Sequence, residues 1–289
     1  MASSKPTSKT DLLPRSVEDL HGPYRAVSIR PIQLAARSLP VYGAGMVWND
    51  WIDRDIDAKV KRTKNRPLAS GRVRLSHAII WMAIQYLVAG WILYSSVESL
   101  SVWGFAMLFE TIGTALYPFG KRPAARRWHI YPQYILGALN LPLVVSGWAA
   151  IYREERLGLV ASVERALPLS LMMLIWTMYY NTAYSYQDIK DDRNLGVQSM
   201  YVLAGQNIHT FLVGLGVLVL GNIIWVLVAV KSVWLWLSWM GVWTVAYLSQ
   251  FRHFDPAHPE TGGSLHKHNV YLGVWTVFVC AIEVLLAGM

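Results

Sequence analysis

The stretch IHTFLVGLGVLVLGNIIWVLVA, residues 208–229, decides the fold class, because it contains no Asp, Glu, Lys or Arg. A helix of about 20 mostly apolar residues is long enough to cross the hydrocarbon core of a bilayer. Runs of similar length and character lie on both sides of it along the chain. We therefore predict about eight membrane-spanning helices, at residues 32–48, 75–97, 100–118, 131–151, 168–186, 208–229, 232–250 and 270–288.

The composition supports a membrane protein. Of the 289 residues, 54% are apolar and 15% are charged, and the mean hydropathy is +0.31. The apolar runs are continuous rather than alternating and are too long for barrel strands. We predict an all-α, polytopic helix bundle, in which residues 31–289 form one transmembrane domain and residues 1–30 a polar N-terminal segment without the apolar core of a secretory signal.

The charged residues exclude some classes of function. The single cysteine, Cys280, can form neither a disulfide framework nor a cysteine zinc site. The net charge of +8 comes from Lys and Arg gathered in loops beside apolar runs, so we expect lipid contacts and no nucleic acid. Arg37, Glu110 and Glu283 fall inside predicted spans, which makes the limits of those spans approximate.

The loops predict the orientation. Basic residues crowd residues 49–74 and the loop from Lys121 to Arg127, whereas the turns near Glu98 and Lys231 are nearly bare, so the positive-inside rule puts the basic loops in the cytosol. The basic N-terminal segment would then face away from the cytosol. We expect either that an N-terminal span is missing or that residues before 48 form a re-entrant or irregular segment.

An acidic motif ends the first predicted span. Asp50, Asp53 and Asp57 fall within roughly 60° of one another on a helix, and Asp55 points away. Three carboxylates on one stripe repel each other unless a cation lies between them. Hard divalent cations prefer such oxygen ligands, and Mg²⁺ is commonly held by a few carboxylates together with phosphate oxygens. We predict a magnesium site here.

A second acidic motif ends the fifth predicted span, where Asp188 and Asp192 share a helix face. Four crossings separate the two motifs, so both open on the same side of the membrane. Facing each other across a bundle, they would form a metal cradle for a diphosphate. The negative charge of such a leaving group needs protein cations as well as metal, and the candidates are Arg66, Lys121 and Arg122.

The residues and the spacing of these motifs resemble those of the UbiA family of membrane prenyltransferases. The first signature reads Asn49-Asp50-x-x-Asp53-x-x-x-Asp57 and is followed by residues 62–71, RTKNRPLASG. Later parts of the family pattern are matched in order by Tyr117-Pro118-x-x-Lys121-Arg122, Gln133 with Leu136-Gly137, Gly147-Trp148, and the segment from Tyr184 through Asp192 to Ser199. The resemblance covers nearly all of the chain from Asn49 to Gly273.

The resemblance implies a bundle of nine helices in which both motifs bind magnesium diphosphate, with Asp50, Asp53 and Asp188 central to catalysis. It implies that one Mg²⁺ is held by Asn49, Asp50, Asp53 and Asp57, another by Asp188 and Asp192, and phosphate by Arg66, Lys121 and Arg122. The chain departs from the family in two respects: the family's first helix is absent, and Gln198 stands where the family usually has Lys.

The family chemistry needs no nucleophilic side chain. The allylic C–O bond ionises, and an electron-rich acceptor carbon attacks the carbocation, which rings such as Trp48, Tyr117, Tyr180 and Tyr184 would stabilise. The closest resemblance is to the 4-hydroxybenzoate polyprenyltransferase branch, including fungal relatives that farnesylate phenolic or pyrone polyketides in meroterpenoid biosynthesis. We favour the fungal secondary-metabolite activity, in the endoplasmic reticulum or another endomembrane, with ubiquinone biosynthesis as the alternative. The oligomeric state stays open.

Two other classes remain as alternatives. An ion-coupled transporter would use intramembrane carboxylates, but these are expected near the bilayer midplane rather than at helix ends. A zinc hydrolase would need a histidine cluster, yet the spacing of the histidines matches no helical metal-binding pair, and solvated or interfacial side chains are the better interpretation of them. The histidines in question are His253, His258, His266 and His268.

Overall fold

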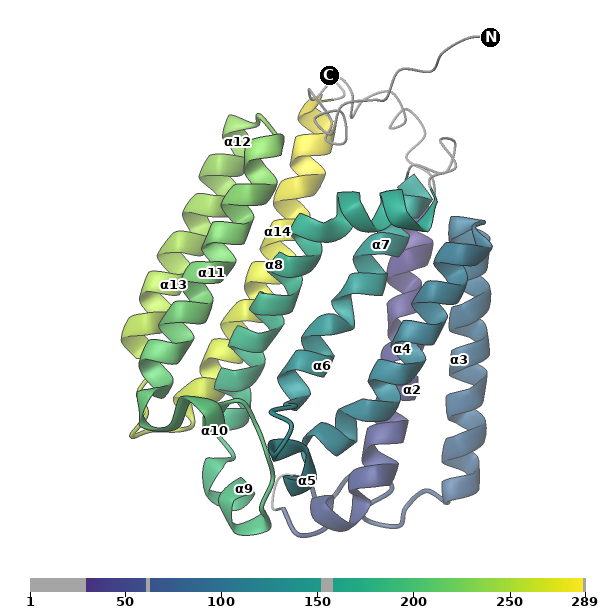
Figure 1. The fold of residues 1–289 in the computed structure, drawn as a ribbon, viewed down its shortest axis with the longest axis vertical. Coiled ribbons are helices and arrows are strands. Elements are labelled where there is room, and N and C mark those ends of the chain that lie inside the picture. The colour runs from purple at the N-terminus through teal and green to yellow at the C-terminus, as the bar shows by residue number, and fades with distance from the viewer. Residues whose placement is uncertain (1–29, 61–62, 152–157, 288–289) are drawn as a thin grey trace.

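The computed structural model describes residues 30–60, 63–151 and 158–287, and over these residues the chain forms helices and short connections with no strand. Figure 1 shows the long helices side by side in one bundle, with short helices gathered at one end. The prediction of an all-α, polytopic membrane bundle is therefore confirmed.

Most of the bundle is made of long helices. These are α2 (Arg30–Asp57), α3 (Leu75–Val97), α4 (Leu100–Gly120), α6 (Pro132–Ala138) with α7 (Asn140–Ile151), α8 (Leu159–Tyr186), α11 (Ile208–Ala229), α12 (Val233–Leu235) with α13 (Val242–His253), and α14 (Thr261–Ala287). Shorter helices occupy the loops, namely α5 (Pro123–Arg126), α9 (Ile189–Leu195) and α10 (Tyr201–Ala204), the last followed by the 3₁₀ turn η3 (Gly205–Asn207).

Within the part of the chain that the structure describes, six helical segments are long and apolar enough to span a membrane: residues 75–97, 100–120, 132–151, 159–186, 201–228 and 261–286. The predicted bounds of α3 and α11 agree with the structure at both ends. Helix α2 and the α12–α13 segment are not among the six, so the predicted count of eight spans stays a prediction. Residues 30–48 are helical rather than irregular, and residues 1–29, with the predicted polar N-terminal segment, lie outside the described residues.

Two helices begin nine residues earlier than predicted. Helix α8 starts at Leu159 and continues through Pro168, the residue at which we had predicted the span to start. Helix α14 starts at Thr261 and includes a glycine pair and polar side chains that read as a loop. Packing explains this second difference, because Leu265 and Asn269 are buried.

Two predicted spans are not continuous α-helices. The span at 131–151 breaks at Leu139, where the Asn140 side chain donates to the Gly137 carbonyl and to the Thr177 hydroxyl, both at 3.0 Å. The span at 232–250 contains a π-helical segment, η4 (Trp236–Gly241). Within it the Ser238 carbonyl accepts a hydrogen bond of 2.8 Å from Trp275, which ties this segment to α14.

Helix α8 joins the two halves of the bundle (Figure 1). Its first turns contribute Ala166 to an apolar cluster with α3, α4 and α7, and its later turns contribute Tyr179 and Ala183 to a larger cluster with α11, α13 and α14. The close approach of α6 is possible because Gly137 lies against the backbone of Leu174, where a β-carbon would be 2.9 Å from the carbonyl oxygen.

The charges inside the predicted spans have polar partners. Arg37 of α2 forms a buried ion pair with Glu110 of α4. Glu283 of α14 accepts a hydrogen bond of 2.7 Å from the Ser232 hydroxyl, which also caps the first turn of α12. Pairing lowers the cost of placing charged groups in an apolar medium.

Candidate active site

The first acidic motif occupies the last two turns of α2. Asp53 and Asp57 are 4% and 6% exposed, and the side chain of Asp50 is 16% exposed, whereas that of Asp55 is 87% exposed. The three residues that were predicted to share a helix face are thus turned into the protein, and Asp55 is turned outward. The division follows directly from the 100° rotation per residue of an α-helix.

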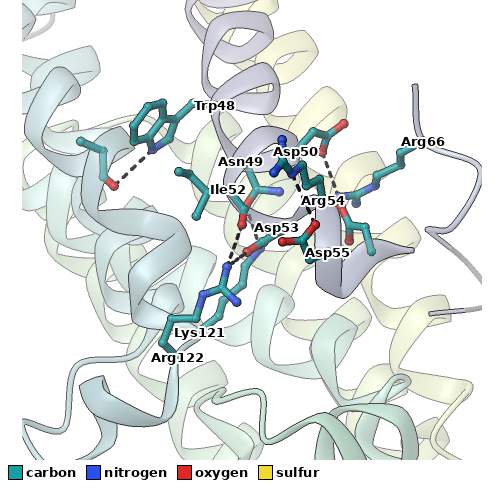
Figure 2. A network of polar contacts seen from close by, with 12 residues as sticks. Trp48, Asn49, Asp50, Ile52, Asp53, Arg54, Asp55, Arg66, Lys121 and Arg122 are labelled. Atoms are coloured by element: carbon teal, nitrogen blue, oxygen red, sulfur yellow. Dashed lines mark hydrogen bonds and ion pairs between the residues drawn. The ribbon is translucent and has the colours of Figure 1, made fainter. Parts of the chain in front are cut away.

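Two adjacent cations from the end of α4 meet this motif (Figure 2). Lys121 Nζ donates to Asp53 Oδ2 and to Asn49 Oδ1, each at 2.7 Å. Arg122 donates to Asp53 Oδ1 and to the Ile52 carbonyl, each at 2.9 Å. Both oxygens of the buried Asp53 carboxylate are therefore neutralised by charge-assisted hydrogen bonds.

The third predicted cation, Arg66, approaches the motif from the loop after α2. Its Nη1 donates to Asp50 Oδ1 and Asp57 Oδ2, each at 2.9 Å, so one guanidinium connects two carboxylates that lie two helical turns apart. Burial raises the pKa of Asp57 above its usual value, and Arg66 together with the Thr63 hydroxyl acts in the opposite direction. The ionised form of Asp57 thus depends on Arg66.

The second acidic motif lies at the same end of the bundle as the end of α2, in the connection from α8 to α9 (Figure 1). Asp192 accepts a hydrogen bond of 2.9 Å from the Tyr201 hydroxyl of α10. Helix α9 ends at Leu195 and is capped by Gly196, whose φ of +68° favours glycine. After α9, the backbone N–H of Gln198 donates to the backbone carbonyl of Lys121 at 2.8 Å. Because Lys121 contacts the first motif, this bond links the segment after α9 to that motif.

A buried polar network lies next to the second motif. From the sequence we predicted no role for its residues, apart from the place of Gln133 in the family pattern. The Gln133 side chain donates to Ser199 at 2.7 Å and to Ser185 at 3.2 Å, and it accepts from the Met200 amide at 3.1 Å. The available signal was a glutamine inside an apolar run. This network fixes the loop after α9 against α6 and α8.

The predicted aromatic residues lie close to both motifs. The ring of Tyr117 is 4.8 Å from Lys121 Nζ, and Trp48 donates to the Ala115 carbonyl at 3.2 Å. Tyr184 precedes Asp188 by one helical turn, and Tyr180 precedes Tyr184 by another. These half-buried rings therefore lie within two helical turns of the charged end of the bundle.

The donor set fits a magnesium diphosphate better than a metal alone. Within the described residues, no three His, Cys, Asp or Glu side chains lie close enough together to hold a metal ion, and this includes the four histidines of the zinc alternative. Magnesium does not need such a cage, since it usually takes one or two carboxylates and completes its coordination shell with water and phosphate oxygens. Asn49, Asp50, Asp53 and Asp57 supply oxygen atoms of that kind.

Charge balance points in the same direction. The three carboxylates of the first motif are matched by the three cations of Arg66, Lys121 and Arg122. The cluster therefore has little positive charge left for an anionic ligand. A diphosphate would need additional cations to bind here, and a divalent metal that arrives with it supplies them.

Comparisons with known proteins identify the family of the chain. Residues 32–277 match the model of the UbiA prenyltransferase family. The chain is 50% identical over 246 residues to polyprenyl transferase pyr6 of Aspergillus fumigatus, covering 85% of this chain and 76% of the relative. It is 52% identical over 248 residues to polyprenyl transferase cle5 of Aspergillus versicolor, covering 85% and 77%.

A solved structure shows the same fold. The apo structure of a UbiA homolog from Aeropyrum pernix K1 superposes with a TM-score of 0.71 at 19% sequence identity, covering 86% of this chain and 89% of that one. The family model and the two relatives each extend over most of the sequence, including both acidic motifs. This chain therefore belongs to the UbiA prenyltransferase family and is a membrane prenyltransferase.

Proposed function

We propose that the enzyme transfers a farnesyl group from its diphosphate to a phenolic or pyrone polyketide, in a Mg²⁺-dependent reaction of fungal meroterpenoid biosynthesis. The observation that carries this proposal is the charged cluster at the end of α2, where Asp50, Asp53 and Asp57 are paired with three cations from two other segments. The relatives at about 50% identity are fungal proteins named polyprenyl transferase, which supports prenyl transfer as the reaction.

The cations of the cluster bind the leaving group. When the allylic C–O bond breaks, its electron pair leaves with the diphosphate, and Arg66, Lys121 and Arg122 stabilise the charge where it develops. Each of these cations contacts a carboxylate in the structure, so the incoming diphosphate exchanges carboxylate contacts for phosphate contacts. The first motif together with Asp188 and Asp192 would hold Mg²⁺, which when bound would neutralise part of the diphosphate charge and make it a better leaving group.

The aromatic residues serve the other half of the reaction. The acceptor carbon forms a C–C bond to the allylic cation, and the acceptor then loses a proton. Half-buried rings of Trp48, Tyr117, Tyr180 and Tyr184 exclude water and attract the cation through their faces, each worth about 0.5–2 kcal/mol. We also propose that both motifs face the cytosol from an endomembrane such as the endoplasmic reticulum, as the basic loops indicate.

Assays on membranes that contain the expressed chain test the proposal. We would incubate them with geranyl, farnesyl, geranylgeranyl or longer diphosphates and a panel of phenols, hydroxypyrones and 4-hydroxybenzoate. We expect farnesylation that stops with EDTA and returns with Mg²⁺. Prenylation of 4-hydroxybenzoate alone, with long-chain donors, would support the ubiquinone alternative instead.

Variants test the roles of the motifs. Asp50→Asn and Asp188→Asn should each lower turnover by at least about 100-fold, the size of effect expected when charge stabilisation of a leaving group is lost. Asp55→Asn is the matched control, because this carboxylate lies in the same motif but points outward. Full activity of both Asp50→Asn and Asp188→Asn would refute the roles proposed for the two motifs.

A further inference from the structure

One histidine has surroundings that the diphosphate chemistry does not explain. His266 lies in the second turn of α14, where it is half-buried rather than solvated or interfacial as we had expected. Its ring centroid is 4.7 Å from that of Tyr184 and 5.4 Å from that of Tyr180. Its Nδ1 is buried and has no hydrogen-bond partner among the described residues. A buried polar nitrogen without a partner costs free energy, which suggests that it serves a ligand.

The position of His266 is fixed by the close packing of α14 on α8. Gly262 lies directly against the carbonyl oxygen of Ala183, and Gly263 lies against the side chain of Gln187. One turn after His266, Asn269 accepts a hydrogen bond of 2.8 Å from Trp176 of α8 and donates one of 2.8 Å to Gln250 of α13. These contacts on either side of His266 hold α14 in register, so its ring is presented to α8 at a defined place.

That place borders the proposed reaction centre. Tyr184, which touches His266, precedes Asp188 of the second motif by one helical turn. Tyr180, the other neighbour, precedes Tyr184 by one turn of the same helix. The histidine thus lies against the two rings that lead along α8 to the second motif.

We propose that His266, with Tyr180 and Tyr184, binds the hydroxyl group of the aromatic acceptor. This inference rests on the function proposed above. A planar phenol or hydroxypyrone stacks against the tyrosine rings, and its O–H donates to Nδ1 of the imidazole, which carries its own proton on Nε2.

The same contact assists the reaction. As the acceptor carbon next to the hydroxyl forms its C–C bond, the hydroxyl proton passes to Nδ1 and the acceptor oxygen becomes a carbonyl. Loss of the proton from the new tetrahedral carbon, with return of a proton to oxygen, restores the hydroxyl. The diphosphate, which left with the C–O electron pair, takes up the proton that is released overall.

The test compares acceptors with a free and an O-methylated hydroxyl. We expect the wild-type enzyme to prefer the free hydroxyl by about 10- to 100-fold in kcat/KM, the range for one hydrogen bond to a buried polar group. His266→Phe keeps an aromatic ring against Tyr184 but has no nitrogen, so its preference should fall to about 1. The KM for the prenyl diphosphate should stay within about twofold of the wild-type value.

His268→Phe is the matched control, because this side chain is two residues further along the same helix and is exposed. It should keep the wild-type preference. His266→Gln retains a hydrogen-bond acceptor and should keep part of the preference for the free hydroxyl. This variant tests the role of His266 if the melting temperature shows that His266→Phe does not fold.

The outcomes separate the two proposals. A wild-type enzyme that prenylates no phenol or hydroxypyrone would refute the proposed function itself. A wild-type enzyme that does so, while His266→Phe or His266→Gln keeps the full preference for the free hydroxyl, would overturn only the assignment of His266. A loss of preference that tracks the substitution at 266 and not at 268 supports it.

Discussion

Helix α14 packs so closely against α8 that one methyl group added at their contact should push the two helices apart. In Gly262→Ala the new β-carbon would lie 2.0 Å from the Ala183 carbonyl oxygen, whereas ordinary contact begins at 3.4 Å. The obstructing atom belongs to helix backbone and cannot rotate away. The two helices must therefore move apart by about 1.4 Å.

That movement has a cost that can be approximated. Overpacking of this kind costs about 1–3 kcal/mol. A displacement of this size would also stretch the 2.8 Å hydrogen bond between Trp176 and Asn269 beyond bonding distance, and a hydrogen bond between membrane helices contributes about 0.6 kcal/mol on average. A total of about 2–4 kcal/mol corresponds to a lower melting temperature by about 4–16 °C.

Detergent-purified protein is suitable for the measurement, with melting followed by size-exclusion chromatography after heating. Gly221→Ala is the control, because a β-carbon there meets nothing within 4 Å, and the substitution in mid-helix should stabilise the protein by up to about 1 kcal/mol. If Gly262→Ala melts within 1 °C or so of the wild type, the close contact of α14 with α8 is wrong, and the placement of His266 with it.

Three further predictions concern charges. Arg37→Leu should destabilise the protein by about 3–5 kcal/mol by leaving Glu110 buried without its partner, and adding Glu110→Leu should restore most of the melting temperature; a double variant as unstable as the single one would contradict this. Lys121→Met should lower kcat/KM for the prenyl diphosphate by about 100- to 1000-fold in steady-state assays. Lys64→Met, at an exposed position, should leave it unchanged. Equal effects of the two substitutions would argue against a specific contact between Lys121 and the diphosphate. Burial raises the pKa of Asp57, so its ionisation opposes folding, and the stability of the protein in EDTA should fall as pH rises from 3.8 through the raised pKa. Asp57→Asn should make the melting temperature depend less on pH over this range. A melting temperature that depends on pH equally in both proteins would contradict the raised pKa.

Local patterns explain which parts of the structure were predictable. The inward faces of Asp50, Asp53 and Asp57, and the outward face of Asp55, follow from helical periodicity, which depends only on neighbouring residues. The helix bounds of α3 were predictable because polar residues mark both of its ends. Periodicity and hydropathy therefore account for the membrane fold and for the shape of the first motif.

Contacts between distant segments were not predictable in the same way. We predicted Lys121 and Arg122 as phosphate ligands, but their pairing with Asp53 spans about 70 residues and depends on how α4 packs against α2. The early start of α14 was missed because glycines and histidines have low hydropathy, although here the glycines allow helix contact and His266 is half-buried. Tertiary packing overrode local composition at both places.

The backbone hydrogen bond between Gln198 and Lys121 has a practical consequence for enzyme engineering. It links the loop that carries the second motif directly to a residue that contacts the first, so neither loop can be exchanged alone without losing its anchor. A chimera that borrows donor or acceptor preference from a related enzyme should therefore import residues 117–122 and 188–199 together, as one transplanted unit.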